Sequence, residues 1–191
     1  MSWSGFRSRI KIFGRENRAV AAVEFALIAP IFFASVFCIV ETSIDYYIIA
    51  TLDGIVEQVS LPLQTGVPQL AGLQSWQFKQ TYVCPLVKGF LNCSNLIVNI
   101  QSNFGNAYGN NGFSPPPSPP LSDSTFASYC PGSGGYSTTV TISYPVSQIT
   151  GIWSSAGTSV NGAGQTVRIF QASVGFILQP TFTVTPTCTM G

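Results

Sequence analysis

A single apolar stretch, residues 19–40, constrains the fold of this chain more than any other feature of its sequence. The stretch contains one charged residue, Glu24, and no other strongly polar side chain. As a helix its 22 residues would span about 33 Å, enough to cross a hydrocarbon core of about 30 Å. Lipid offers no hydrogen-bond partners to the backbone, so a single crossing segment has to be helical. The sequence therefore predicts one transmembrane helix at residues 19–40.

The charges that flank this stretch indicate its orientation. Residues 1–18 contain five basic residues against the single acid Glu16, whereas the chain beyond residue 40 has only three basic residues. By the positive-inside rule the leader, residues 1–18, is cytoplasmic and the C-terminal part is exported. A nucleic-acid-binding role for the basic leader is disfavoured, because the adjoining apolar run explains its charges as a topology signal. The lipid bilayer is the expected partner of the apolar helix.

Residues 41–60 continue the helical pattern beyond the predicted span. Apolar residues recur there at spacings of three and four, and the acidic residues occupy other positions around the helix. We expect an amphipathic stalk helix that is continuous with the span and ends at Leu61-Pro62. Together with the span it would form an anchor of about 40 residues, roughly 60 Å long.

Residues 61–191 have the composition of a small β-rich domain. Alternating, β-branched segments predict strands at 96–100, 137–145, 166–170 and 180–185, and residues 167–178 could form one long strand with a bulge at Gly175. A Gly-, Asn- and Pro-rich segment, residues 102–120, predicts a flexible surface loop. The expected fold class is α+β: a long N-terminal transmembrane and stalk helix, followed by a small antiparallel sheet that covers the stalk's apolar stripe.

Four of the five cysteines lie in the region expected to be exported, and the fifth, Cys38, lies in the span. An even number of cysteines in an oxidising compartment predicts two disulfides, for which three connectivities are available. We favour a short loop closed by Cys84 and Cys93 and a long loop closed by Cys130 and Cys188.

The residue types needed for catalysis or for metal binding are scarce. The chain has no histidine, and beyond residue 60 its only acidic residue is Asp123, so the exported part cannot supply a carboxylate pair. No CxxC spacing supports a metal site. We therefore expect a protein that is not an enzyme, with no cofactor and no metal.

Residues 21–30, Ala21-Ala-Val-Glu-Phe-Ala-Leu-Ile-Ala-Pro30, resemble the signature of the TadE/TadG-like proteins. These are minor pilins, or pseudopilins, of bacterial tight-adherence (Flp) pili, a branch of the type IV pili. The resemblance covers residues 15–60 well. It implies a minor pilin or pilus-assembly protein of the inner membrane, with its C-terminal domain in the periplasm. The implied partners are other pilin subunits and inner-membrane pilus assembly proteins.

The resemblance also implies a processing step and an assembly residue. A prepilin peptidase would cut between Ala19 and Val20, which would make Glu24 the fifth residue of the mature chain. Glu24 would then pair with the N-terminal ammonium of a neighbouring subunit. Prepilin sites usually carry glycine where this chain has Ala19, so a cleaved pilus subunit and an uncleaved membrane component are both open.

A second functional class is also open from the sequence. An uncleaved, membrane-anchored adhesin or ligand-binding protein would use its exported β-rich head to bind a carbohydrate or another surface ligand. Aromatic side chains that stack on sugars would have to be exposed on that head, and the sequence offers candidates for this role: Tyr108, Phe113, Tyr129 and Trp153.

Overall fold

The computed structural model describes residues 17–87, 89, 91–103, 128–146, 158–160, 166–185 and 188. The chain divides into an N-terminal unit, Met1–Ile44, and a second unit, Asp45–Gly191, which we call the head. The longest element, helix α2, covers Asn17–Gln64 and so contributes to both units. The predicted continuity of span and stalk is therefore confirmed.

Helix α2 ends later than the sequence predicted. It continues through Pro62 to Gln64, because Leu63 is fully buried in the head and holds the last turn in place. Gly66 then takes a left-handed conformation (φ 79°) and its N–H donates to the Leu63 carbonyl. A side chain at Gly66 would collide with the ring of Phe182, so both backbone conformation and packing require glycine.

Short helical segments connect α2 to the sheet. They are α3 (Val67–Leu70), α4 (Ser75–Phe78), the π-helical turn η1 (Lys79–Val83) and two 3-10 turns, η2 (Cys84–Leu86) and η3 (Cys93–Asn95). Phe78 and Val83 are fully buried, so these pieces form part of the head's core.

The sheet contains four strands in the order β1-β2-β4-β3: β1 (Ile97–Ser102), β2 (Ser137–Val146), β3 (Thr158–Val160) and β4 (Thr166–Ile177). Each neighbouring pair is antiparallel. The predicted α+β class with a small antiparallel sheet is thus confirmed. The outer edge of β1 is also bridged in parallel by Tyr129.

Two details of the strand prediction are wrong. Gly175 is not a bulge, because it pairs with Thr139 in a register that runs unbroken from Ser137↔Ile177 to Val146↔Arg168. Residues 180–185 form no strand, although they alternate well. Phe182 is buried there, and the Val184 N–H donates to the Ser133 hydroxyl, so tertiary contacts replace strand pairing.

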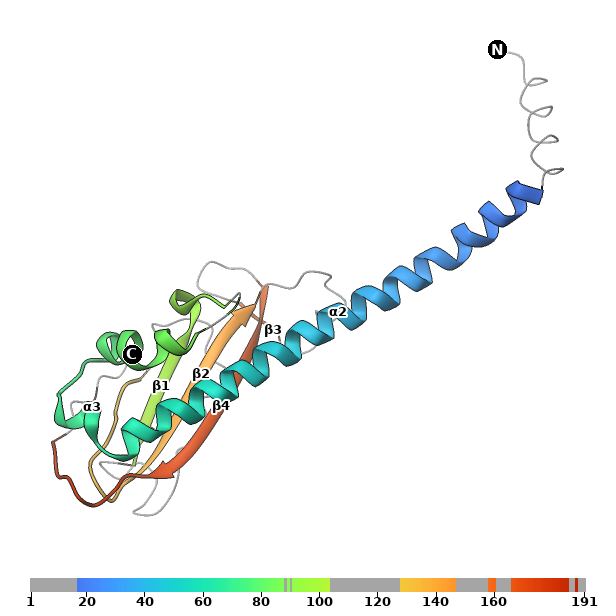
Figure 1. Cartoon of the computed structure of the whole chain (residues 1–191). Coiled ribbons are helices and arrows are strands. Elements are labelled where there is room, and N and C mark those ends of the chain that lie inside the picture. Colours follow the sequence, from blue (N-terminus) through green and yellow to red (C-terminus); the bar gives the residue numbers. More distant parts are fainter. Residues whose placement is uncertain are drawn as a thin grey trace, which may run out of the picture. The chain divides into compact units, whose positions relative to one another are not determined.

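The core of the head lies between α2 and one face of the sheet. Figure 1 shows α2 crossing in front of β1, β2 and β4. The register puts alternate residues of the strands on this face, and in the helix the buried positions recur at three- and four-residue spacings. The Gln179 N–H donates to the Gln64 carbonyl, which satisfies an acceptor in the last turn of the helix. Core side chains include Ile48, Leu52, Ile55, Val56, Val59, Ile100, Val140, Ile142, Phe170 and Ala172.

Candidate membrane and assembly segment

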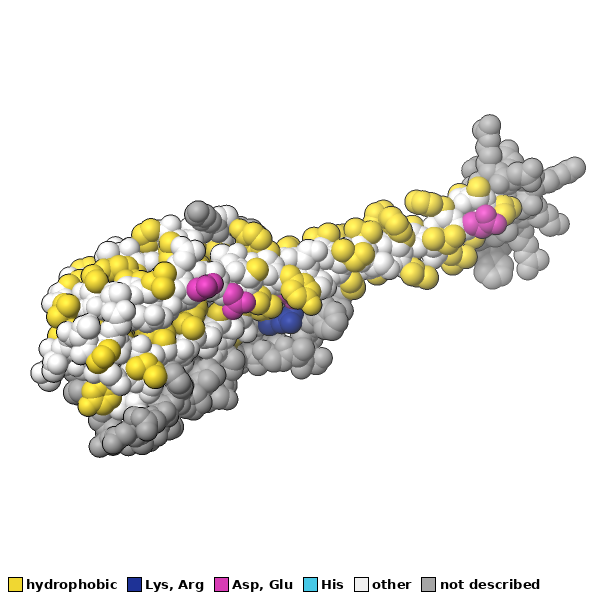
Figure 2. Space-filling model, turned by 60° about the horizontal axis from the view of Figure 1, so that its bottom comes forward, with side chains coloured by type: hydrophobic (Ala, Val, Ile, Leu, Met, Phe, Trp, Pro, Cys, Tyr) yellow, Lys and Arg dark blue, Asp and Glu magenta, His cyan; other side chains and the backbone are white. Residues whose placement is uncertain are grey.

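The N-terminal part of α2 presents apolar side chains all around its circumference. Between Val20 and Val40 nearly every large apolar residue is exposed, and Phe25, Leu27 and Ile31 are each about 70% exposed. Figure 2 shows hydrophobic side chains along the whole length of this part of the helix on the face in view. Within the described part of the chain, it is the one helix long and apolar enough to cross a membrane. A helix that is apolar all around, without protein to cover it, is suited to lipid.

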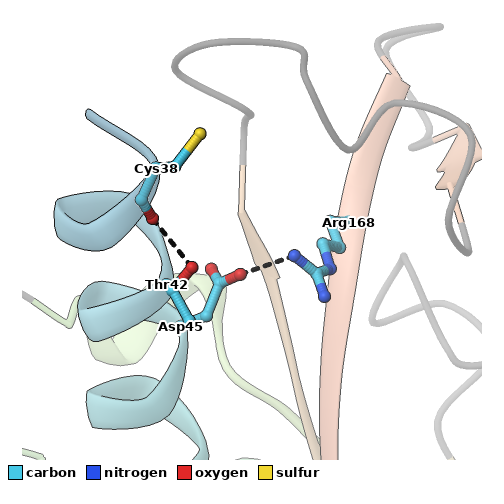
Figure 3. A network of polar contacts seen from close by, with 4 residues as sticks. All are labelled: Cys38, Thr42, Asp45 and Arg168. Atoms are coloured by element: carbon cyan, nitrogen blue, oxygen red, sulfur yellow. Dashed lines mark hydrogen bonds and ion pairs between the residues drawn. The ribbon is translucent and has the colours of Figure 1, made fainter. Parts of the chain in front are cut away.

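The hydroxyl groups in this segment are satisfied by the helix itself. Ser35, Thr42 and Ser43 each donate to the backbone carbonyl four residues earlier, at 2.7–2.9 Å. Figure 3 includes one of these bonds, from the Thr42 hydroxyl to the Cys38 carbonyl. Such back-bonding leaves no hydroxyl donor unpaired in a medium that offers no partners.

Glu24 is the exception to this pattern of internal satisfaction. It lies two turns into α2, is exposed, and has no hydrogen-bond or ion-pair partner among the described residues. Its neighbours Val23 and Phe25 are 61% and 69% exposed, so the carboxylate projects from an apolar surface. An ionised carboxylate in such a position needs a cationic or hydrogen-bonding partner beyond the residues that the structure describes.

The expected cleavage junction also lies within the helix. Because α2 begins at Asn17, the Ala19–Val20 peptide bond lies in its first turn. A protease needs an extended backbone at the bond it cuts, so processing at this position would require the first turn to unwind. Helix ends fray easily, since their first four N–H groups have no intrahelical acceptor.

The head contains two disulfides, Cys84–Cys93 and Cys130–Cys188, which is the connectivity favoured from the sequence. The first closes a loop between η2 and η3. The second joins Cys130 to Cys188. Cys130 follows Tyr129, which bridges the edge of β1, and Cys188 lies near the C-terminal end of the chain. Cys38 is a free thiol in the N-terminal unit.

An ion pair that sequence reasoning missed joins α2 to the sheet. The Arg168 guanidinium of β4 contacts the Asp45 carboxylate at 2.5 Å, and the two side chains are 29% and 19% exposed. Figure 3 shows both side chains reaching across from their elements. The Arg168 guanidinium also lies over the Phe170 ring, 5.0 Å from its centroid. The only sequence signal for this contact is that Arg168 is the one charged residue between residues 124 and 191.

A second polar contact holds the π-helical turn against the start of β1. Lys79 Nζ donates to the carbonyl oxygens of Leu96 and Ser94. Burial lowers the pKa of Lys79 from its ordinary value, because the charged form loses hydration. Lys79 therefore acts as a structural clamp beside the Cys84–Cys93 loop.

The adhesin interpretation required exposed aromatic residues on the head, and the expectation for Tyr129 is wrong. Tyr129 is only 4% exposed and its ring packs against Phe78. Burial, with a further contribution from Tyr82, raises the pKa of Tyr129 to about 12. It is drawn inward because the 128–130 segment pairs with the edge of β1. Tyr108, Phe113 and Trp153 lie outside the described residues.

The pocket near α3 lacks the features expected of a sugar site. It has a volume of about 130 Å³, and no aromatic side chain lines it. Among the described residues no group of three or more Cys, Asp or Glu side chains is placed to hold a metal ion. The lining residues of the pocket are Pro68, Gln69, Gly72, Leu73, Gln74, Pro131, Val184 and Thr185.

Comparison with known proteins finds a family-model match in the N-terminal helix. Residues 19–59 match the family model described as TadE-like protein. No curated protein and no solved structure matches the chain. The match covers most of α2 and includes Ala19, Val20 and Glu24, while the sheet lies beyond it. TadE-like proteins are a structural, non-enzymatic pilus family, and together with the long apolar helix the match indicates membrane anchoring. The chain therefore carries a TadE-like domain at residues 19–59, which indicates a Tad pilus-associated protein.

Proposed function

We propose that this chain is a minor pilin or pilus-assembly protein of a bacterial tight-adherence pilus, inserted in the inner membrane with its N-terminus in the cytoplasm. The observation that carries the proposal is an exposed carboxylate, Glu24, on an exposed apolar helix whose sequence matches the TadE-like model. The helix anchors the chain, and Glu24 is the point at which it associates with other subunits.

The proposed assembly step rests on electrostatics in a low-dielectric medium. An aspartate at the centre of a bilayer costs about 2.5–3.5 kcal/mol on insertion scales, and this value is an upper bound for Glu24, which lies near one end of the apolar stretch. A cation held against the carboxylate offsets this cost, and the attraction between them is far stronger there than in water. If the chain is cut between Ala19 and Val20, the new ammonium group of Val20 on a neighbouring subunit is the natural partner of Glu24. Their pairing would also fix the axial register between adjacent helices.

The proposed topology places the head in the periplasm. Five basic residues precede the apolar stretch at residues 19–40, which supports a cytoplasmic N-terminus. The two disulfides of the head support an oxidising compartment on the other side. An alkaline phosphatase fusion at the C-terminus should therefore be active, and a fusion within the leader should be inactive.

The main test replaces the Glu24 carboxylate while keeping its shape. Glu24→Gln should leave membrane insertion intact, as judged by resistance to alkaline extraction, but should abolish incorporation into sheared pili and co-purification with other pilus components. Glu57→Gln is the matched control, because Glu57 is an exposed acid on the same helix within the head. Normal piliation of the Glu24→Gln strain would rule out the pairing role.

The N-terminus of the native protein distinguishes two forms of the proposal. An intact mass that corresponds to a chain starting at Val20 would establish prepilin-type processing. It would favour incorporation of this protein into the filament. A chain that retains its basic leader would favour a permanently anchored assembly component, in which Glu24 pairs with a membrane partner.

A further inference from the structure

The first turns of α2 within the head present two different faces. Residues on the inner face are buried or paired: Ile48 and Leu52 lie in the core, and Asp45 holds Arg168. The outer face exposes Tyr46, Ile49 and Ala50, followed by Asp53 and Glu57. Positions 46, 49, 50, 53 and 57 fall on one side of a helix with 3.6 residues per turn. The outer face is therefore apolar and aromatic up to Ala50 and acidic from Asp53 onward.

The two adjacent tyrosines have different environments. Tyr47 is 42% exposed, but its hydroxyl lies so close to Gly89 that a side chain at Gly89 would collide with it. Gly89 belongs to the loop closed by Cys84 and Cys93. Tyr46 is 69% exposed, with no described contact to the head. Tyr47 thus contacts the head, whereas the described residues of the head give Tyr46 no such contact.

We infer that Tyr46, with Ile49 beside it, inserts into the headgroup layer of the bilayer and fixes the depth at which α2 is anchored. This inference rests on the proposed function, because it requires residues 20–40 to cross the membrane.

The position of Tyr46 along the helix matches that layer. Tyr46 follows Val40, the last residue of the apolar segment, by six residues in the same helix, a rise of about 9 Å. The headgroup layer on each side of the hydrocarbon core is about 5–8 Å thick. Helical side chains also point back toward the N-terminus, so the phenol of Tyr46 lies closer to the bilayer than its own Cα atom. Asp53 lies about 20 Å beyond Val40, outside the layer.

The chemistry of the side chains favours lipid headgroups over other occupants. Tyrosine combines an apolar ring with a hydroxyl that hydrogen-bonds, which is why it concentrates at membrane–water interfaces. Ile49, which is 39% exposed, lies one turn further along the same face and adds apolar area. On this side of the helix Thr42 and Ser43 lie between Ile39 and Tyr46, and both hydroxyls donate to carbonyls of the helix itself, so they do not require a partner other than lipid.

The test measures depth in the full chain reconstituted into vesicles of phosphatidylethanolamine and phosphatidylglycerol. Tyr46→Trp adds an emitting side chain at the proposed depth, and the emission of the native tryptophans is subtracted using the unsubstituted protein. Leu61→Trp is the matched control, since Leu61 is 60% exposed and lies fifteen residues further along the same helix. Phe32→Trp reports on the middle of the apolar segment. Lipids carry a nitroxide quencher either at the headgroup or at acyl carbon 12.

Headgroup nitroxide should quench the added emission of Tyr46→Trp at least about two-fold more strongly than that of Leu61→Trp. Equal quenching of the two variants would overturn the inference. So would a blue-shifted Tyr46→Trp emission that no lipid quencher reduces, because it would mean that a second copy of the chain covers this face. Quenching of Phe32→Trp by the deep label tests the anchoring separately. If the deep label does not quench Phe32→Trp, the proposal that residues 20–40 cross the membrane is wrong. If it does quench Phe32→Trp, the Tyr46→Trp result tests only the role of Tyr46.

Discussion

Removing the two disulfides separately should destabilise the head by different amounts. A disulfide stabilises largely by restricting the unfolded chain, and the effect grows with the length of the loop that it closes. Cys84 and Cys93 are 9 residues apart, whereas Cys130 and Cys188 are 58 residues apart. For these separations the loop-entropy relation gives about 2.6 kcal/mol for the short loop and about 4.2 kcal/mol for the long one. The expected difference is therefore about 1.6 kcal/mol.

The comparison uses two double variants of the full chain in mild detergent, Cys84→Ser/Cys93→Ser and Cys130→Ser/Cys188→Ser. Urea unfolding of the head is followed by far-ultraviolet circular dichroism and by tryptophan emission. With an m value of about 2 kcal/mol/M, the midpoint of the long-loop variant should lie about 0.8 M below that of the short-loop variant. Cys38→Ser is the control, because Cys38 is a free thiol in the N-terminal unit and should leave the midpoint unchanged.

An equal or larger loss for the short-loop variant would refute the reasoning. It would show that contacts in the native head dominate the effect of the short disulfide. The relevant contacts would be those around η2 and η3, such as the Lys79 clamp. If the long-loop variant is unfolded without urea, its unfolding is measured in added osmolyte, which favours the folded state by being excluded from the protein surface.

Three further perturbations test the packing and the electrostatics of the head. Leu52→Ala should lower the free energy of urea unfolding by about 2–5 kcal/mol, because Leu52 is fully buried, while Leu61→Ala at an exposed position should change it by less than about 0.5 kcal/mol. A double-mutant cycle of Asp45→Asn and Arg168→Gln should give a coupling of about 1 kcal/mol that falls at high salt, and no coupling would mean that the pair is only a structural coincidence. The pKa of Tyr129 is raised to about 12, so the folded head keeps a proton that the unfolded chain loses above pH 10, and its stability should fall between pH 10 and 12. Tyr129→Phe should remove this part of the alkaline loss, which urea midpoints measured across that pH range would reveal.

The candidate site could be predicted from sequence because it depends on local properties. The length and hydropathy of residues 19–40, with Glu24 as their one charge, follow directly from the order of the residues. The match to the TadE-like model covers the same stretch. The place of Tyr46 in the head could not be predicted in this way, because residues 41–60 show only which side chains share a helix face. Nothing in that pattern reveals that Tyr47 packs on Gly89 while Tyr46 is left exposed.

The sequence by itself determined the long apolar helix, the amphipathic stripe that follows it and the positions of the three longer strands, because each of these depends on a periodicity readable within one segment. The tertiary structure decided the features that depend on residues far apart in the chain. Helix α2 continues past Pro62 because the Leu63 side chain is buried in the core of the head. Residues 180–185 form no strand because the Phe182 side chain is buried there instead. Arg168 and Asp45 form an ion pair although they are 123 residues apart in the sequence. The fold also decides which of the three disulfide connectivities forms, because it brings particular cysteines together. Such contacts depend on three-dimensional proximity, which a one-dimensional pattern does not contain.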